Sequence, residues 1–317
     1  MCLVIDLPSH PIPLAVLTGP TASGKTGLAI ELAERFGAEV VSADSMQVYR
    51  RLDIGTAKPT AEERARVPHH LLDVADPAEA FDTVRFQELA DAAIARIHAS
   101  GRRVLVVGGT GLYLRILLYG LADVPGADPE RRRRLEAEAE AGGNIALHSR
   151  LADLDPAAAR RIHVSDRFRL VRALEVIEST GRPISELQGE HRFARARYPH
   201  RILALELPRE ELRVRILRRA EAMVAGGLVD EVRGLLRNGY SPDLRPLRGF
   251  GYREPVRCVL GERAEEGLAE AIARDTAHYA KRQATWLRSE RGVEWVAPDA
   301  GEVARRFASL WGSGERE

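Results

Sequence analysis

Leu14-Ala-Val-Leu-Thr-Gly-Pro-Thr-Ala-Ser-Gly-Lys-Thr26 is the stretch of sequence that decides the fold. The apolar run 14–18 predicts a buried strand, and Gly19 to Thr26 follows it as a complete G-x-x-x-x-G-K-T sequence. Apolar residues then recur at helical spacing as far as Gly37, at Leu28, Leu32 and Phe36. The order of strand, glycine-rich loop and helix is the context in which this pattern forms a phosphate-binding P-loop.

The composition of this loop predicts how it holds a phosphate group. Its glycines let backbone N–H groups turn inward around phosphate oxygens, and the start of the following helix adds its dipole. Lys25 supplies a positive charge, and the Thr26 hydroxyl can ligate Mg²⁺. The residues that we expect to bind the phosphates are Gly19, Thr21, Ala22, Ser23, Gly24, Lys25 and Thr26. The pattern does not say which phosphate compound is bound.

Two further strands are predicted to end in special turns. Residues 39–42 lead to Asp44, and residues 103–107 lead into Gly108-Gly109-Thr110-Gly111. A helix is expected over about 84–98, between these strands. Strands that alternate with helices imply an α/β fold with a parallel sheet, whose ligands lie at the carboxyl ends of the strands. All three turns fall at that edge.

The middle of the chain has a different character. Residues 129–142, 144–154 and 166–180 read as charged or amphipathic helices, with no strand between them. We therefore expect a helical insert over 125–200 and a core domain made of 1–124 and 201–317. In the core, we expect a strand over 201–207, a helix over 209–225 and a last strand over 293–296.

The net charge of the chain is close to zero, so it does not by itself indicate a polyanionic partner. The positions of the arginines are more informative. The chain has 47 basic and 46 acidic residues, but its arginines cluster at 131–134, 160–172, 191–201, 213–219 and 245–257. Such patches suit phosphate contacts, or they are solvated helix faces. No apolar run is long enough to cross a membrane, and the first residues lack the pattern of a secretory leader, so we expect a cytoplasmic protein. Cys2 and Cys258 match no metal or disulfide pattern.

Several residues at the predicted edge can carry chemistry, and each has a plainer alternative. Asp44 can support a metal, accept a proton or cap the turn after it. Thr110 can donate to a leaving oxygen or cap a helix. Arg215 and Arg219 share a helix face and can bind a diphosphate, or they lie on the surface. The run Arg248, Gly249, Phe250, Gly251, Tyr252 and Arg253 has a composition suited to stacking on an unpaired base.

Taken together, the chain resembles the tRNA dimethylallyltransferases over about residues 14–296. The resemblance rests on separate stretches that occur in order: 19–26, Ser42-Ala-Asp-Ser-Met-Gln-Val-Tyr49, Asp53-Ile-Gly-Thr-Ala-Lys-Pro59, Pro68-His-His-Leu71, Val107-Gly-Gly-Thr-Gly-Leu-Tyr113, Arg169-Leu-Val-Arg-Ala-Leu-Glu175, Gly251-Tyr-Arg253 and Lys281-Arg-Gln-Ala-Thr-Trp-Leu287. It implies a nucleotide-kinase-like P-loop core with a helical insert that binds tRNA.

The resemblance also implies an activity and the residues that perform it. The enzyme would transfer a dimethylallyl group from dimethylallyl diphosphate to N6 of adenosine 37, next to the anticodon of tRNA. The P-loop would bind the diphosphate with Mg²⁺ at Thr26, Asp44 would be the general base, and Thr110 and Arg215 would lie near the reacting groups. The implied tRNA contacts are Asp44, Ser45, Met46, Gln47, Arg132, Phe168, Arg169, Leu170, Val171, Arg172 and 248–253.

Three other functions stay open on the sequence. A small-molecule or nucleotide kinase would bind ATP in the same P-loop, but the strand 103–107 ends in glycines rather than in a metal-holding carboxylate. An RNA-binding protein could use the P-loop as a nucleotide switch. A prenyltransferase acting on free adenine nucleotides would give the arginine-rich insert little to hold. We expect a monomer.

Overall fold

The computed structural model describes residues 12–121, 124, 126, 128–191, 193 and 195–311. They form two compact units. Unit 1 runs as far as Leu118 and resumes at Arg197, and unit 2 is Tyr119–Ala196. These limits lie a few residues before those expected from the sequence, because Arg197 is bound to unit 1: its N–H donates to Leu118 O at 2.8 Å, and its guanidinium pairs with Asp91. Among the described residues, no helix is both long and apolar enough to cross a membrane.

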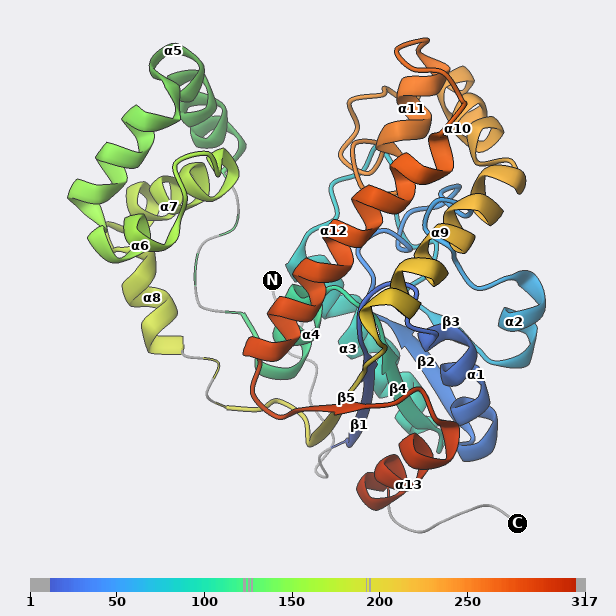
Figure 1. Cartoon of the computed structure of the whole chain (residues 1–317). Helices are drawn as coiled ribbons and strands as arrows, with labels where there is room; N and C mark the ends of the chain where they lie inside the picture. Colours follow the sequence, from blue (N-terminus) through green and yellow to red (C-terminus); the bar gives the residue numbers. More distant parts are fainter. Residues whose placement is uncertain are drawn as a thin grey trace. The chain divides into compact units, whose positions relative to one another are not determined.

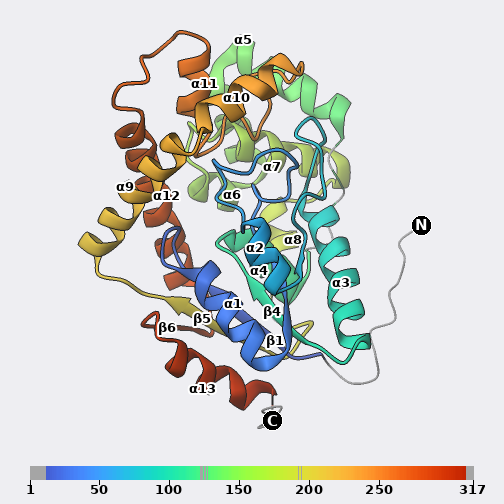
Figure 2. The same ribbon diagram turned by 90° about the vertical axis from the view of Figure 1, so that its right-hand side faces the viewer.

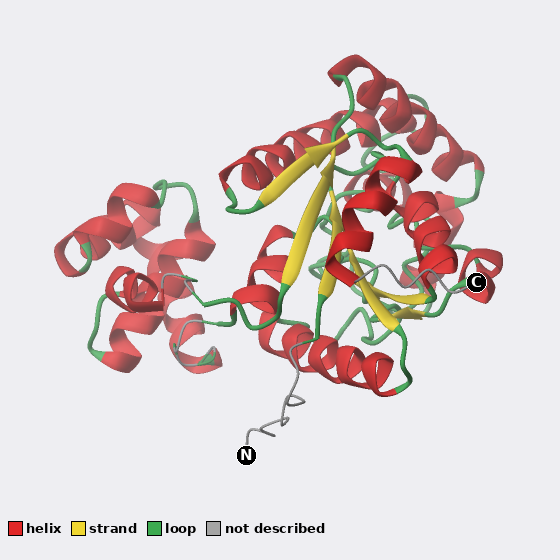
Figure 3. Ribbon diagram, turned by 90° about the horizontal axis from the view of Figure 1, so that it is seen from below, coloured by secondary structure: helices red, strands yellow, loops and turns green. Residues whose placement is uncertain are grey.

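Unit 1 is built on one parallel sheet, as the sequence predicts. Its strands are β1 (Leu14–Thr18), β2 (Ala38–Ser42), β3 (His69–His70), β4 (Arg103–Val107), β5 (His200–Leu205) and β6 (Val293–Val296). They lie in the order β3-β2-β4-β1-β5-β6, and all neighbours are parallel. Helices cover both faces of the strands (Figure 3). The two-residue strand β3 is too short for a periodic pattern to predict.

Three helices bury the faces of this sheet. α1 (Lys25–Phe36) and α13 (Ala300–Trp311) share one apolar cluster with β1, β2, β4, β5 and β6. α3 (Thr83–Ala99) packs against β2 and β4 on the opposite face (Figure 2). α4 (Gly111–Tyr119) begins directly after the glycine turn that follows β4. The P-loop is therefore anchored on both sides, by buried β1 and by buried α1.

The segment between β2 and β3 is held by one buried cation. Lys58 is 2% exposed in its side chain, and its Nζ donates to Tyr49 O at 2.6 Å. The same ammonium pairs with Asp53 and Asp73, at 2.7 Å each. Short helix α2 (Ala61–Arg66) follows, with Thr60 as its cap. A buried ammonium with three oxygen partners fixes the course of this long connection.

A layer of helices lies beyond the carboxyl ends of the strands. It consists of α9 (Arg209–Ala225), α10 (Leu228–Arg237), α11 (Arg253–Val259) and α12 (Leu268–Ser289). α9 and α12 lie side by side along much of their length (Figure 1). The predicted helix over 209–225 is confirmed at both ends, since it stops at Gly226. These two helices supply side chains to the edge where the P-loop lies.

Unit 2 is a separate bundle with its own core. It contains α5 (Pro129–Leu154), α6 (Pro156–Arg161), α7 (Arg167–Thr180) and α8 (Ile184–His191). The predicted helices 129–142 and 144–154 are the two halves of α5, which a non-helical residue, Gly143, interrupts with φ 76°. The helix over 166–180 is confirmed as α7, and α8 was not predicted. Buried residues of the core include Leu135, Leu151, Leu170 and Leu174.

Candidate active site

The P-loop joins β1 to α1 in a tight curl. Gly19 has φ 139°, a conformation that side chains disfavour, and a Cβ there would lie 3.0 Å from Leu205 O on the neighbouring strand. Gly24 caps α1 at φ 94°. Thr21, Ala22, Gly24, Lys25 and Thr26 line a pocket, whereas Gly19 and buried Ser23 shape the curl behind it.

Lys25 lies inside the curl with its charge uncompensated. Its Nζ donates to Gly19 O at 2.9 Å and to Pro20 O at 2.8 Å. Burial, helped by the nearby Arg219 guanidinium and opposed by Asp44, lowers the pKa of Lys25 to about 8. Among the described residues, no carboxylate is within salt-bridge distance of this ammonium. Two N–H groups of the Lys25 ammonium therefore donate to carbonyl oxygens, and an anionic ligand can replace these oxygens as the acceptor.

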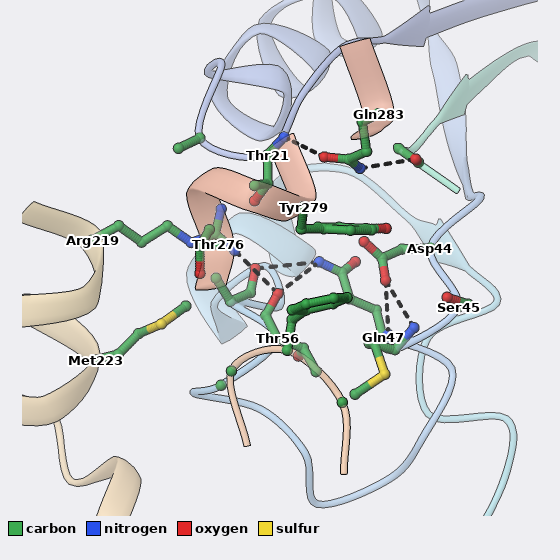
Figure 4. A pocket seen from close by; sticks show the side chains of 18 of the residues that line it. Thr21, Asp44, Ser45, Gln47, Thr56, Arg219, Met223, Thr276, Tyr279 and Gln283 are labelled. Carbon is green, nitrogen blue, oxygen red and sulfur yellow. Dashed lines mark hydrogen bonds between the residues drawn. The ribbon is translucent and has the colours of Figure 1, made fainter. Parts of the chain in front are cut away.

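The turn after β2 holds Asp44 at the pocket. Its Oδ1 accepts from the N–H groups of Met46 and Gln47, at 2.8 and 3.3 Å. The other carboxylate oxygen faces the pocket on the side of Tyr279 (Figure 4). The interpretation of Asp44 as a cap of the turn is therefore confirmed for one oxygen, and the other oxygen lies at the pocket.

Thr110 lies behind this turn rather than at the pocket surface. Its Oγ1 accepts from Ser45 N–H at 3.0 Å, and its hydroxyl donates to Ser45 Oγ at 3.3 Å. Neither contact caps α4, so the alternative of a helix cap is not what the hydroxyl does. It instead fixes the backbone of Ser45, next to Asp44. Thr110 is thereby a neighbour of the site that acts through Ser45.

Two arginines of α9 approach the P-loop from the other side. Arg215 Nη1 comes within 3.4 Å of the position that a Cβ would take on Gly24, and the same side chain pairs with Glu211 at 2.8 Å. Arg219 donates to Thr56 O at 3.3 Å, and burial lowers its pKa. Both line the pocket, although the Arg215 side chain is also 40% exposed to solvent.

These elements enclose one cavity of about 520 Å³. Figure 4 shows Thr21, Asp44, Arg219 and Gln283 directed toward it. The P-loop and the arginines form its polar side. Apolar side chains of α9 and α12 form another part of the wall, namely Ile216, Ala220, Met223 and Ile272. A phosphate-bearing molecule with a short apolar chain fits this division of polar and apolar surface.

Helix α12 contributes side chains to the site that were not predicted from the sequence. Thr276, Tyr279 and Gln283 lie on its inner face and line the cavity. Burial raises the pKa of Tyr279, so its hydroxyl stays protonated, and its ring stacks on Phe250 with centroids 4.8 Å apart. The spacing of Ile272, Thr276, Tyr279 and Gln283 by three or four residues was the pattern that could have identified this face.

The loop 53–57 was also missed as a wall of the cavity. Glu231 on α10 accepts from the N–H groups of Asp53 and Ile54, at 3.0 and 2.8 Å. Thr56 O accepts from Gln47 Nε2 at 3.3 Å as well as from Arg219. The predicted tRNA contact Gln47 thus has an amide that already holds this loop.

The run 248–253 divides between the cavity and the interior. Gly249, Phe250 and Gly251 line the cavity, and Phe250 is 38% exposed. Tyr252 is fully buried against Gly55, and its hydroxyl donates to Glu231 at 2.7 Å. The other end of the run, Arg253, pairs with Asp275 and Glu254. Phe250 is therefore the aromatic side chain of this run that a ligand can reach, whereas Tyr252 is not.

The chemistry of this site suits Mg²⁺ held mainly by its ligand. The described residues contain no group of three or more His, Cys, Asp or Glu that could hold a metal ion. Thr26 is among the residues that line the cavity. Mg²⁺ keeps several waters and is commonly bound by a few protein oxygens together with substrate phosphates. The residues present fit that mode of binding.

In unit 2, the predicted tRNA contacts surround a buried carboxylate. Glu175 is 1% exposed in its side chain and pairs with Arg132 and Arg172, at 3.0 and 2.9 Å. Phe168 is 63% exposed and lies under the Arg132 guanidinium. Arg169 is exposed and pairs with Asp166. The side chains of Leu170 and Val171 are buried in the core of unit 2.

Two arginines of the cluster at 191–201 have acidic partners inside unit 1. Arg197 pairs with Asp91, and Arg201 pairs with Glu294, both inside unit 1. Arg201 also donates to Arg306 O and Ser309 on α13, so it joins β5, β6 and that helix. Arg192 lies outside the described residues. These paired arginines hold unit 1 together.

Comparisons with known proteins show the family of this chain. The family model IPP transferase matches residues 47–290. The chain is 55% identical to a tRNA dimethylallyltransferase of Anaeromyxobacter sp. strain Fw109-5 over 298 residues, which is 92% of this chain and 98% of the relative. It is 50% identical to that of Geobacter sulfurreducens over 283 residues, covering 89% of this chain and 91% of the relative.

Solved structures give the same result. The full-length tRNA isopentenylpyrophosphate transferase of Bacillus halodurans has a TM-score of 0.70 and 38% identity, with 95% of this chain and 97% of that chain covered. A eukaryotic dimethylallyltransferase acting on tRNA has a TM-score of 0.79 and 27% identity, with 94% and 78% covered. The similarity therefore extends over nearly the whole chain in both sequence and fold.

Proposed function

This chain belongs to the IPP transferase family of tRNA dimethylallyltransferases, and we propose that it transfers a dimethylallyl group from dimethylallyl diphosphate to N6 of the adenosine next to the anticodon of tRNA. The observation that carries this proposal is the meeting of two kinds of group in one cavity. Lys25, Arg215 and Arg219 supply positive charge at one end, and Asp44 supplies a carboxylate oxygen at another.

The cations act on the leaving group. N6 attacks C1 of the dimethylallyl group while the C1–O bond breaks, and the electrons of that bond leave with the diphosphate. Negative charge therefore grows on the diphosphate in the transition state, where Lys25, Arg215 and Arg219 stabilise it in a partly desolvated site. The apolar wall formed by Ile216, Ala220, Met223 and Ile272 excludes water from the allylic group.

Asp44 acts on the nucleophile. The exocyclic amine is weakly nucleophilic, and it becomes cationic as the new C–N bond forms. The Asp44 oxygen that is not engaged in the turn accepts a hydrogen bond from N6 and then takes its proton. Because the other oxygen is held by Met46 and Gln47, the carboxylate meets the amine in a fixed orientation.

Mg²⁺ would be held by the Thr26 hydroxyl and the donor's phosphate oxygens, where it would supply further positive charge to the leaving group. Unit 2 binds the anticodon stem and loop through the exposed Phe168 and Arg169. The adenosine leaves its stack to reach the cavity, where Phe250 and Tyr279 offer an aromatic surface. We infer that the enzyme works in the cytoplasm as a monomer.

The direct test is a transfer assay with Mg²⁺, dimethylallyl diphosphate and an unmodified tRNA that carries adenosine 3′ of its anticodon. Mass analysis of the nucleosides should find dimethylallyl-adenosine, and the product should vanish when that adenosine is replaced. Phosphate transfer from ATP to a small acceptor, without this product, would instead assign the site to a kinase.

Asp44→Asn tests the base by itself. Its side-chain oxygen can still accept from Met46 and Gln47, so the turn is kept, but the amide cannot take a proton. We expect kcat to fall by about 10²–10⁴ with tRNA affinity unchanged. Asp44→Ala removes the turn contacts as well, so it is the comparison that separates the two roles. Normal turnover by Asp44→Asn would contradict the assignment of a base.

A further inference from the structure

Gln283 links two turns that come from distant parts of the chain. Its Oε1 accepts from Thr21 N–H at 2.8 Å, and its Nε2 donates to Gly109 O at 2.8 Å (Figure 4). The residue is 7% exposed. A Cβ on Gly109 would lie 2.2 Å from Nε2, so the approach of this amide requires a glycine there. One buried amide thus satisfies one donor and one acceptor of the backbone.

The turn that contains Gly109 is hydrogen-bonded to the turn that holds Asp44. Thr110 follows Gly109, and its Oγ1 accepts from Ser45 N–H at 3.0 Å. Thr110 N–H also donates to Ala43 O at 3.2 Å, and the Thr110 hydroxyl donates to Ser45 Oγ at 3.3 Å. The inner face of α12 therefore connects the P-loop to the Asp44 turn through the turn after β4.

Contacts between strands do not make this connection at the tip of the P-loop. Gly108 N–H donates to Leu17 O at 3.3 Å, and Ala43 N–H donates to Val107 O at 2.8 Å, so the ladder fixes the three turns at their bases. Thr21 lies beyond the end of β1. At that position the backbone N–H is directed to Gln283.

We propose that Gln283 is a positioning residue that sets the distance between the P-loop, with its bound diphosphate, and the Asp44 carboxylate. The proposal rests on the proposed function, because the two reacting groups are those that the P-loop and Asp44 hold. A displacement of about 1 Å between reacting groups can lower a rate about a hundredfold. The oxygen and the nitrogen of its side-chain amide are bonded to the two turns, so Gln283 acts through the turns that it joins.

Gln283→Met tests the hydrogen bonds with little change of shape. We expect kcat to fall about a hundredfold while the Kd for tRNA stays within about twofold. Hydrogen exchange of the P-loop amides should become faster, because Thr21 N–H loses its acceptor. Thr285→Val is the control on the same helix, since Thr285 is exposed and its hydroxyl bonds within the helix to Lys281 O. It should match the unchanged protein in both measurements.

Gln283→Glu adds a pH readout that a merely structural residue would not give. A protonated carboxyl offers one donor and one acceptor, as the amide does, whereas the carboxylate places an acceptor against Gly109 O. The ratio of its kcat to that of the unchanged protein should therefore rise as the pH falls from about 8 to about 6. The same ratio for Gln283→Met should stay flat.

The outcomes separate the two proposals. If the unchanged protein makes no dimethylallyl-adenosine, the proposed function is wrong, and hydrogen exchange of the P-loop in Gln283→Met still decides whether Gln283 fixes that loop. If the product forms but Gln283→Met keeps both normal kcat and normal exchange, the positioning role is wrong. Flat pH ratios for Gln283→Glu and Gln283→Met alike would also overturn it.

Discussion

In the pocket of unit 1, Lys25 and Arg219 have no carboxylate within salt-bridge distance among the residues that the structure describes. In unit 2, Arg132 and Arg172 share the buried carboxylate of Glu175, at 3.0 and 2.9 Å. Both pairs of cations are predicted to meet phosphate groups. They differ in whether the protein supplies the counter-charge itself.

The difference indicates two uses of positive charge. A partly buried cation without a counter-ion raises the free energy of the folded state, and a bound diphosphate removes that cost. The pocket is thus prepared for an anion that it meets in every catalytic cycle. The two cations around Glu175 share one counter-charge that the protein itself supplies, and Arg132 lies over the ring of Phe168 before any RNA arrives. Substitutions in the pocket should therefore change the kinetics of the reaction, whereas substitutions around Glu175 should change the stability of unit 2.

The largest effect should follow from Arg219→Met. Loss of one preorganised charge at the leaving group should lower kcat/KM for dimethylallyl diphosphate by about 10²–10³. The thermal midpoint should not fall, because the guanidinium makes one long bond, 3.3 Å, to Thr56 O and its burial is unfavourable. Steady-state kinetics and calorimetry measure the two quantities. A clear loss of stability with normal kinetics would remove the contrast between the regions.

The next effect, on stability, should follow from Glu175→Gln. This change leaves Arg132 and Arg172 without their shared charge, at a cost on the order of 3 kcal/mol in the unfolding of unit 2. Hydrogen exchange of the α7 amides measures it, because those amides report unit 2 by itself. The matched control is Glu186→Gln, in an exposed pair with Arg182, which should cost less than about 1 kcal/mol.

The loss of unfolding free energy caused by Glu175→Gln should depend on pH in a definite direction. Burial alone would raise the pKa of Glu175, but Arg172, the Asp128 N–H and Arg132 outweigh it, and the pKa is lowered. A carboxylate whose pKa is lowered on folding stabilises the protein above its unfolded pKa of about 4.3. The difference in unfolding free energy between Glu175→Gln and the unchanged protein should therefore disappear as the pH falls through the folded pKa. A gap that persists in acid would point to shape rather than charge.

The sequence was sufficient for the parts of this molecule that depend on local pattern. The P-loop, the flanking β1 and α1, and the parallel sheet follow from apolar periodicity and glycine placement, and the structure confirms them. Asp44 could be placed at the carboxyl edge for the same reason. These predictions succeed because each rests on contiguous residues.

The missed parts depend on contacts between distant residues. Gln283 meets Thr21 across 262 positions, and Glu231 meets Asp53 across 178. The three- and four-residue spacing on α12 outlines its inner face, but it does not show which distant backbone groups Gln283 will meet there. For a related reason, composition does not reveal that Arg197 and Arg201 have acidic partners. Only the fold decides which charges are already paired.

The smallest effect in this comparison concerns the protonation of Lys25. Its pKa of about 8 means that the free enzyme loses this charge as the pH rises through that value. The diphosphate binds the protonated form better, so kcat/KM for the donor should fall above pH 8, by up to about tenfold per pH unit.

Because the Arg219 charge helps to lower the pKa of Lys25, Arg219→Met should move the midpoint of this pH profile upward. Glu175→Gln should leave it unchanged, since its charge belongs to unit 2. Profiles of kcat/KM measured at saturating tRNA for the three proteins test this order. A common midpoint for all of them would show that the pocket charges are not coupled, and the contrast between the two regions would then rest on stability alone.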